Sequence, residues 1–378
     1  MSSRAKNHRL PSRAASASRR PNEPHGLARN EEDASDGGAS DGGASDGDAS
    51  DGDAPVDEDT SSPSDPENSG TGDGGDDDTG AGTTEDDGAG TEDDVDPGPP
   101  PLLAADYTEP GPWNSGVLTN SFDTPAGLEL WTEVWYPTEE TTGPAGLYTV
   151  GSDPEVMADA TPADSVHRDG YPVHVHSHGD LHLGTGSAFL SRHLASHGWV
   201  SVAMDHTGNT LLDLTADPQS ANFFHRPLDV RAALDAVEQT EILGGQANTQ
   251  AVVLSGHSRG AYTTWSSLGA TYDMDSVREM CASGDGVDGD VCTPEEVAMF
   301  ETDLSDERVV ATIPMDGTIR RQWFGDSGES SVRGPVLYFS SADSGGSQDQ
   351  FESLAPIDFT WVTLEGACHQ SFANGGCT

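Results

Sequence analysis

The segment QAVVLSGHSRG, residues 250–260, decides the fold of this 378-residue chain. Its first five residues are typical of a short buried strand, and residues 260–268 have helical spacing. Between the two lies Gly256-His257-Ser258-Arg259-Gly260, a G-x-S-x-G sequence. A serine on a tight turn from strand to helix is an exposed nucleophile, and its flanking positions must be small because larger side chains would clash. The sequence therefore predicts that Ser258 is a nucleophile, with Gly256, His257 and Gly260 shaping the turn around it.

Strands and helices alternate on both sides of this segment. The hydrophobic pattern predicts helices over residues 187–197, 228–237 and 260–268. It predicts strands over residues 129–136, 171–176, 199–204, 250–254, 309–313, 336–339 and 359–364. Such alternation favours an α/β fold in which a mostly parallel sheet has helices on both faces.

The chain divides near residue 101 into two regions of different composition. From residue 31 to residue 100 there is no Leu, Ile, Met, aromatic residue, Lys or Arg, and residues 34–53 repeat a five-residue unit of the type ASDGG. This composition buries too little apolar surface to offset the entropy lost on ordering, so we predict that residues 1–101 are a disordered acidic region. Residues 102–378 have the length and composition of one folded domain.

The chain is strongly acidic, with 66 Asp and Glu against 17 Lys and Arg and a formal net charge of −49. A protein that binds nucleic acid through electrostatic attraction needs a basic face, so this class is excluded, and docking on an anionic membrane is disfavoured. No stretch has the length of apolar residues that a membrane span needs. We expect a partner or substrate that is neutral or cationic.

A serine nucleophile needs a base and an acid that orients the base, and in this topology the acid and the base follow the serine. The only histidine after Ser258 is His369, in GACHQSF, which makes it the predicted base. Two aspartates follow predicted strands at suitable positions, Asp316 in PMDGT and Asp343 in SSADS. Either loop could present the acid.

Acyl transfer also needs backbone N–H groups that stabilise the developing oxyanion. One predicted donor is the N–H of Arg259, directly after the nucleophile. The second is the N–H of Asp180, in the Ser177-His178-Gly179-Asp180 loop after the strand at residues 171–176. A carboxylate pointing inward would repel an oxyanion, so we expect the Asp180 side chain to face solvent.

The same loop suggests a rival chemistry, because His174, His176 and His178 recur at every second position and are followed by Asp180. On a strand such imidazoles share one face, as ligands of a metal ion would. The rest of the chain supplies few further ligands, so we favour no metal and assign these histidines to packing around the oxyanion loop.

Four cysteines form two close pairs, Cys281 with Cys292 and Cys368 with Cys377. An even count in pairs predicts two disulfides and an oxidising compartment, either extracellular or at the cell surface. The first thirty residues contain no apolar run typical of a signal peptide, so the two indications disagree. The first pair lies in an acidic insert at residues 272–307, where Thr293-Pro294 predicts a helix start. The insert either overhangs the site or is a surface excursion.

The motifs GHSRG, PMDGT and GACHQSF, together with residues 176–209, resemble the serine α/β-hydrolases of the platelet-activating-factor acetylhydrolase, chlorophyllase and dienelactone-hydrolase-like group. The resemblance covers most of residues 112–373 and implies the α/β-hydrolase fold. It favours Asp316 as the acid, because that group commonly places the acid in an Asp-Gly turn after the strand that follows the nucleophile helix. Cutinase-like relatives place it one strand later, which would select Asp343. True dienelactone hydrolases have cysteine where this chain has Ser258, and chlorophyllases usually have glycine where it has Ala261.

These features predict a serine-dependent carboxylic ester hydrolase that needs no cofactor and acts on a small-molecule, lipid or polyester ester. Two alternatives remain open. One is a non-catalytic binding module on a hydrolase fold, and the other is metal-dependent hydrolysis through the cluster of His174, His176 and His178.

Overall fold

The computed structural model describes residues 106–124, 127–213, 221–283, 292–317, 324–325, 328, 331–342, 354, 357–374 and 377. The region predicted to be disordered, residues 1–101, lies outside the described residues, and so does Asp343.

The described part of the domain contains a ten-stranded sheet with the order β10-β9-β8-β7-β5-β6-β2-β1-β4-β3. In chain order the strands are β1 (Asn114–Asp123), β2 (Glu129–Thr138), β3 (Ala145–Leu147), β4 (Ser152–Ala158), β5 (Tyr171–Ser177), β6 (Val200–Asp205), β7 (Ala247–His257), β8 (Val309–Met315), β9 (Val336–Ser341) and β10 (Phe359–Leu364). The six strands from β5 to β10 are parallel to one another, whereas β2 is antiparallel to β6 and to β1. This strand order and direction confirm the predicted α/β-hydrolase fold.

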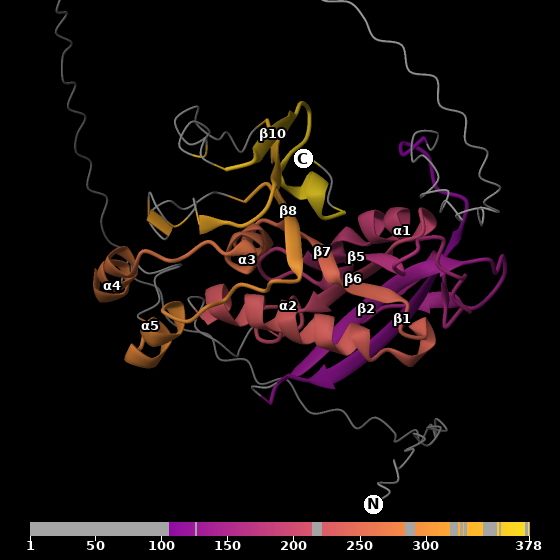
Figure 1. Cartoon of the computed structure of the whole chain (residues 1–378), viewed down its shortest axis with the longest axis horizontal. Coiled ribbons are helices and arrows are strands. Elements are labelled where there is room, and N and C mark those ends of the chain that lie inside the picture. The colour runs from indigo at the N-terminus through magenta and orange to yellow at the C-terminus, as the bar shows by residue number, and fades with distance from the viewer. Residues whose placement is uncertain are drawn as a thin grey trace, which may run out of the picture. The chain divides into compact units, whose positions relative to one another are not determined.

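Helices cover both faces of the sheet. They are α1 (Ala188–Ser196), α2 (Asn222–Glu238), α3 (Arg259–Leu268), α4 (Met274–Ser283) and α5 (Pro294–Phe300). One face packs on α1 through a small cluster that includes Trp135 and Ala203. The other face packs on α2 and α3 through the main core, and Figure 1 shows α2 running across the front of the sheet. Strand β5 serves both layers, because Val173 and Val175 belong to the main core while His174 and His176 alternate with them.

Every predicted strand is present, and β10 has the predicted bounds. The largest difference is in α2, which begins at Asn222 rather than at residue 228 because it continues through Pro227. Proline interrupts the hydrogen bonding of a helix interior, so a helix running through it is not expected from sequence. Strand β1, the short strands β3 and β4 and the helix α4 had no predicted counterpart.

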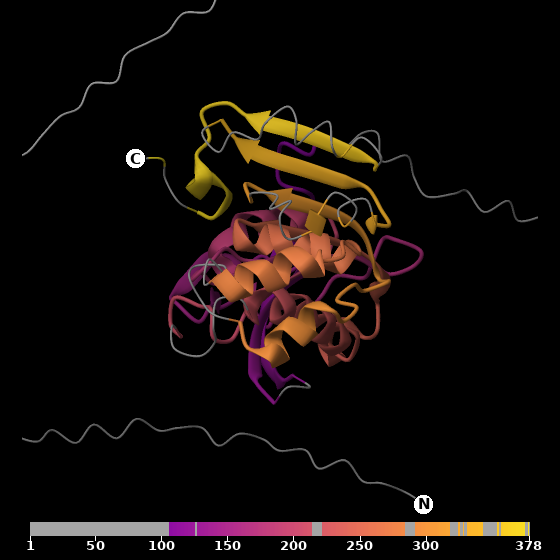
Figure 2. The ribbon, with the colours of Figure 1, turned by 90° about the vertical axis from the view of Figure 1, so that its left-hand side faces the viewer.

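The parallel strands bring their carboxyl ends to one edge of the sheet. Figure 2 shows β9 and β10, in orange and yellow, side by side at the end of the sheet, next to the C-terminal segment. Ser258 follows β7, Asp316 follows β8, and the loop with His178 follows β5. Ligands of open α/β sheets bind at this edge, so the predicted site residues lie where this fold places its chemistry.

The insert at residues 272–307 contains α4 and α5, which are joined by the Cys281–Cys292 disulfide. Helix α5 begins as predicted, with Thr293 and Glu296 forming a capping box. The insert packs against the start of α2, since the rings of Phe300 and Phe224 make an edge contact and the Tyr272 hydroxyl donates to the carbonyl of Phe223. In its described contacts the insert therefore packs on α2 as an additional layer of helices.

Candidate active site

Ser258 occupies a strained turn between β7 and α3. Its backbone has φ 54° and ψ −115°, a conformation that non-glycine residues adopt only when the surroundings enforce it. A Cβ atom on Gly256 would lie 2.1 Å from the carbonyl oxygen of Gly260, and one on Gly260 would lie 2.0 Å from that of Ser177. Only glycine fits at either position, so the turn has the geometry of a nucleophile elbow.

His369 and Asp316 are hydrogen-bonded to each other. The Nδ1 atom of His369 lies 2.6 Å from Oδ2 of Asp316, whose side chain is completely buried while that of His369 is 42% exposed. The carboxylate also accepts hydrogen bonds from the Ser341 N–H and hydroxyl, at 2.6 and 3.2 Å. An Nδ1–H donated to Asp316 leaves Nε2 of His369 as the proton acceptor, which is the state that a general base requires.

Ser258 lies directly beside this pair. The Ser258 N–H donates to the carbonyl of Met315, the residue before Asp316. From the other side, Nε2 of His257 donates to the carbonyl of His369 at 2.9 Å, and the two imidazole rings are 4.6 Å apart. Among the described residues no hydrogen bond joins the Ser258 hydroxyl to His369, a contact that often tightens only when substrate binds.

The loop after β5, which contains the predicted oxyanion donor Asp180, lies against the turn at Ser258. A Cβ atom on Gly179 would lie 3.4 Å from Cβ of Ser258. Asp180 is partly exposed, as expected, yet its carboxylate is not free in solvent, because Oδ1 accepts from Nε of Arg259 at 2.7 Å and from Nδ2 of Asn209 at 2.8 Å. Partial burial opposes the charged form, but these hydrogen bonds outweigh it and lower the pKa of Asp180.

The three histidines of the rival metal site do not converge. His174 binds the hydroxyls of Ser201 and Ser255, each at 2.8 Å, and Nδ1 of His176 shares Ser255. His178 turns elsewhere and accepts from the N–H of His206 at 3.0 Å. Burial lowers the pKa of His174 to about 3 and the pKa values of His176 and His178 well below the usual range. Within the described ranges no three His, Cys, Asp or Glu side chains are arranged to hold a metal ion.

Sequence reasoning missed two side chains at this edge, Arg226 and Asn209. Arg226, on α2, is 1% exposed and donates to the carbonyls of His178 and Gly179 and to the amide oxygen of Asn209. The only sequence signal was an arginine two residues after the pair Phe223-Phe224, in an apolar stretch where a buried cation is unusual.

The Cys368–Cys377 disulfide brackets the segment that presents His369, so this loop is covalently closed next to the predicted base.

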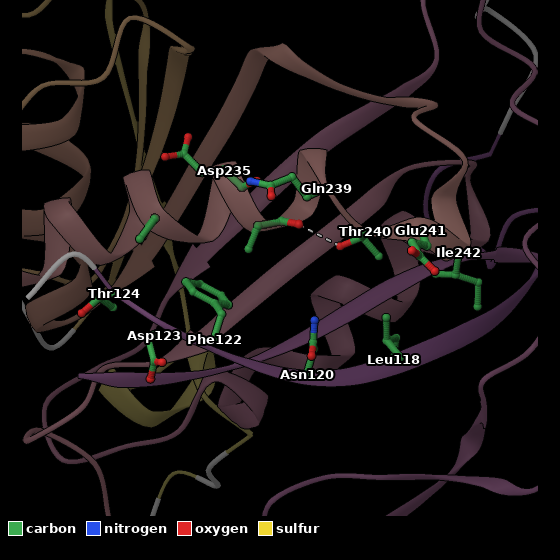
Figure 3. A pocket seen from close by; sticks show the side chains of 12 residues that line it. Leu118, Asn120, Phe122, Asp123, Thr124, Asp235, Gln239, Thr240, Glu241 and Ile242 are labelled. Atoms are coloured by element: carbon green, nitrogen blue, oxygen red, sulfur yellow. Dashed lines mark hydrogen bonds between the residues drawn. The ribbon is translucent and has the colours of Figure 1, made fainter. Parts of the chain in front are cut away.

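An open groove of about 700 Å³ lies between β1 and α2, away from every predicted site residue. Figure 3 shows Asp235 of α2 and Gln239, which directly follows this helix, on one side of the groove, and Phe122 and Asn120 of β1 on the other. The described residues that line the groove include no histidine, cysteine or serine.

No protein-family model matches the chain. No curated protein matches it either. Among solved structures, it is similar to a ferulic acid esterase from Streptomyces cinnamoneus, with 22% identity, a TM-score of 0.43, and coverage of 68% of this chain and 75% of that one. It is also similar to a dienelactone hydrolase-like promiscuous phosphotriesterase from metagenomic libraries, with 16% identity, a TM-score of 0.39, and coverage of 67% and 83%. Similarity at these values is too low to indicate a function, and the fold is assigned from the order and direction of the strands in the sheet.

No helix in the described residues is long and apolar enough to cross a membrane.

Proposed function

We propose that the chain is a serine-dependent carboxylic ester hydrolase with Ser258 as nucleophile, His369 as base and Asp316 as the orienting acid. The observation that carries the proposal is the 2.6 Å contact between His369 and the buried Asp316 beside the strained turn of Ser258. The geometry favours Asp316 over the alternative Asp343, because the Asp316 carboxylate already holds Nδ1 of His369.

The reaction proceeds in two steps through an acyl-enzyme. The Ser258 hydroxyl attacks the ester carbonyl while its proton passes to Nε2 of His369, and Asp316 stabilises the imidazolium that forms. The oxyanion accepts hydrogen bonds from the backbone N–H groups of Arg259 and Asp180. The intermediate then collapses, and the departing alcohol takes the proton from His369. Water, deprotonated by the same histidine, attacks the acyl group. The bond between the acyl carbon and Ser258 then breaks, His369 returns its proton to the serine oxygen, and the acid is released.

The charge of the chain and its disulfides bear on substrate and location. A net charge of −49 disfavours anionic esters, so the substrate is a neutral or cationic small molecule, lipid or polyester. Two disulfides suit a protein that works outside the cytoplasm. The mechanism uses only side chains and backbone groups of the protein and calls for no cofactor.

Hydrolysis of p-nitrophenyl esters of increasing acyl length tests this function. We expect the wild type to hydrolyse them with and without EDTA, and Ser258→Ala to lose roughly 10⁴- to 10⁶-fold in kcat. Ser267→Ala is the matched control, because Ser267 is a buried serine of α3, the helix that follows Ser258, and its hydroxyl has no hydrogen-bond partner among the described residues. Wild-type activity in Ser258→Ala, or loss of activity in EDTA alone, would contradict the proposal.

A further inference from the structure

The proposed oxyanion loop is held from behind by one buried guanidinium. Arg226 donates through one terminal nitrogen to the carbonyl of His178 and through the other to the carbonyl of Gly179, at 3.1 Å. The Gly179 carbonyl also accepts from Nδ1 of His178 at 2.6 Å. Two successive peptide groups are thereby fixed in orientation.

This contact determines where the loop N–H groups point. In a planar trans peptide the C=O and N–H bonds point in opposite directions. The N–H of Asp180 belongs to the same peptide group as the carbonyl of Gly179. Because Arg226 and His178 draw that carbonyl to one side, the Asp180 N–H is turned to the other, and Gly179 is in contact range of Ser258.

The same guanidinium is also linked, through side chains, to Arg259, the residue that supplies the other proposed N–H donor. Arg226 donates to the amide oxygen of Asn209, whose amide nitrogen donates to the carboxylate of Asp180 at 2.8 Å. The same carboxylate oxygen pairs with Nε of Arg259 at 2.7 Å. The two residues that supply the proposed N–H donors are therefore joined through their own side chains.

Burial and charge make this network stiff. Arg226 is 1% exposed and Arg259 is buried against the ring of Phe223, with the guanidinium carbon 5.4 Å from its centroid. Burial lowers the pKa of Arg226 to about 9, which leaves it cationic at neutral pH. Hydrogen bonds that involve a charged group are about twice as strong as neutral ones.

We propose that the clamp formed by Arg226, Asn209 and the Asp180 carboxylate consists of positioning residues that aim the two oxyanion donors. The proposal rests on the function proposed above and extends it, since these side chains act on the oxyanion through the backbone and do not touch the substrate. The proposal also explains the acidic residue in this loop, because the carboxylate of Asp180 forms an ion pair with Arg259.

Comparison of an ester with its thionoester tests the clamp. Sulfur in place of the carbonyl oxygen accepts hydrogen bonds poorly, so the ratio of kcat/KM for the two substrates reports on oxyanion stabilisation and is insensitive to the amount of folded enzyme. For Arg226→Met we expect the ester kcat to fall by about 10- to 100-fold, KM to change little, and the ratio to collapse toward unity. Arg226→Lys, which can reach one carbonyl at a time, falls between Arg226→Met and the wild type.

Milder variants keep the test valid if Arg226→Met does not fold. Asn209→Leu and Asp180→Asn leave every backbone donor in place and lower the ratio by smaller factors. The matched control is Arg308→Met, which removes a partly buried arginine paired with Asp306 and Asp235, and it should lower stability while leaving the ratio unchanged.

The outcomes separate the two proposals. A folded Arg226→Met, Asn209→Leu or Asp180→Asn with the wild-type ratio overturns the clamp while the esterase stands. A wild type that hydrolyses no ester, or a Ser258→Ala that retains activity, overturns the function and the clamp with it.

Discussion

The carboxyl edge of the sheet and the middle of strand β5 hold histidines with opposite environments. At the carboxyl edge, His369 is 42% exposed and is paired with a buried carboxylate. In the middle of β5, His174 and His176 are 1% exposed, and their described hydrogen bonds are to serine hydroxyls. An imidazole that must exchange protons needs access and an anionic partner, whereas one sealed among hydroxyls is held neutral and contributes to packing. Hydrogen-bond partners and solvent access, not the number of histidines close together, are therefore the reasons for proposing His369 as the base.

The largest expected difference between the two environments comes from replacing one histidine in each of them. We expect His369→Gln to lose roughly 10⁴- to 10⁶-fold in kcat, because no other base replaces it. His174→Gln should stay within about tenfold of the wild-type kcat and should lose stability instead, since it removes a satisfied buried group. Ester kinetics and thermal unfolding on both variants measure the two effects, and equal losses of kcat would contradict the assignment.

The acid at the site gives the next largest effect. Asp316→Asn should lower kcat by about 10⁴-fold, because an amide favours the wrong histidine tautomer, as found for other serine triads. Asp343→Asn is its matched control and should change kcat by less than about threefold. A large loss of kcat in Asp343→Asn together with a small one in Asp316→Asn would show that Asp343, one strand later, is the acid.

The buried histidines predict a pH effect on stability. Burial lowers the pKa of His176, His178 and His206 well below 6.5, and that of His174 and His257 to about 3 and 4. In the unfolded chain these histidines bind protons near pH 6.5, whereas in the folded chain they stay neutral. Their contribution to the free energy of unfolding is therefore fully present above pH 6.5 and is lost as pH falls toward 4. Each histidine costs up to about 1.4 kcal/mol per pH unit in that window.

Two buried acids act in the opposite direction. Burial and the nearby Asp205 raise the pKa of Glu133 to about 8, so its contribution is present below pH 4.5 and is lost as pH rises through 8. Burial also raises the pKa of Asp205, whose contribution has the same sign. Five histidines outweigh these two acids, and urea unfolding should give a lower free energy at pH 5 than at pH 7. His174→Gln should flatten that slope, whereas replacement of the partly exposed His193 should not. A free energy that rises on acidification would refute this account of the β5 histidines.

The sequence predicted those parts of the site that follow from local pattern. The turn at Ser258 was visible because two glycines and a serine follow an apolar strand, and His369 was visible because no other histidine follows. The choice between Asp316 and Asp343 needed a resemblance, since both follow strands. The clamp could not be predicted, because Arg226 meets the loop of His178 and Gly179 across 47 or 48 residues of sequence and the helix that carries it runs through Pro227. Pairing over such distances depends on how α2 packs on the sheet, which local pattern does not encode.

Labelling with a fluorophosphonate, followed by peptide mapping, tests the central claim most directly, because only an activated serine reacts rapidly with this probe. We predict one phosphonate adduct per chain, located on Ser258 and absent in Ser258→Ala, with labelling strongly slowed in His369→Gln and Asp316→Asn but not in Asp343→Asn. An adduct on another residue, or labelling of Ser258 at the same rate in all of these His and Asp variants, would contradict the account.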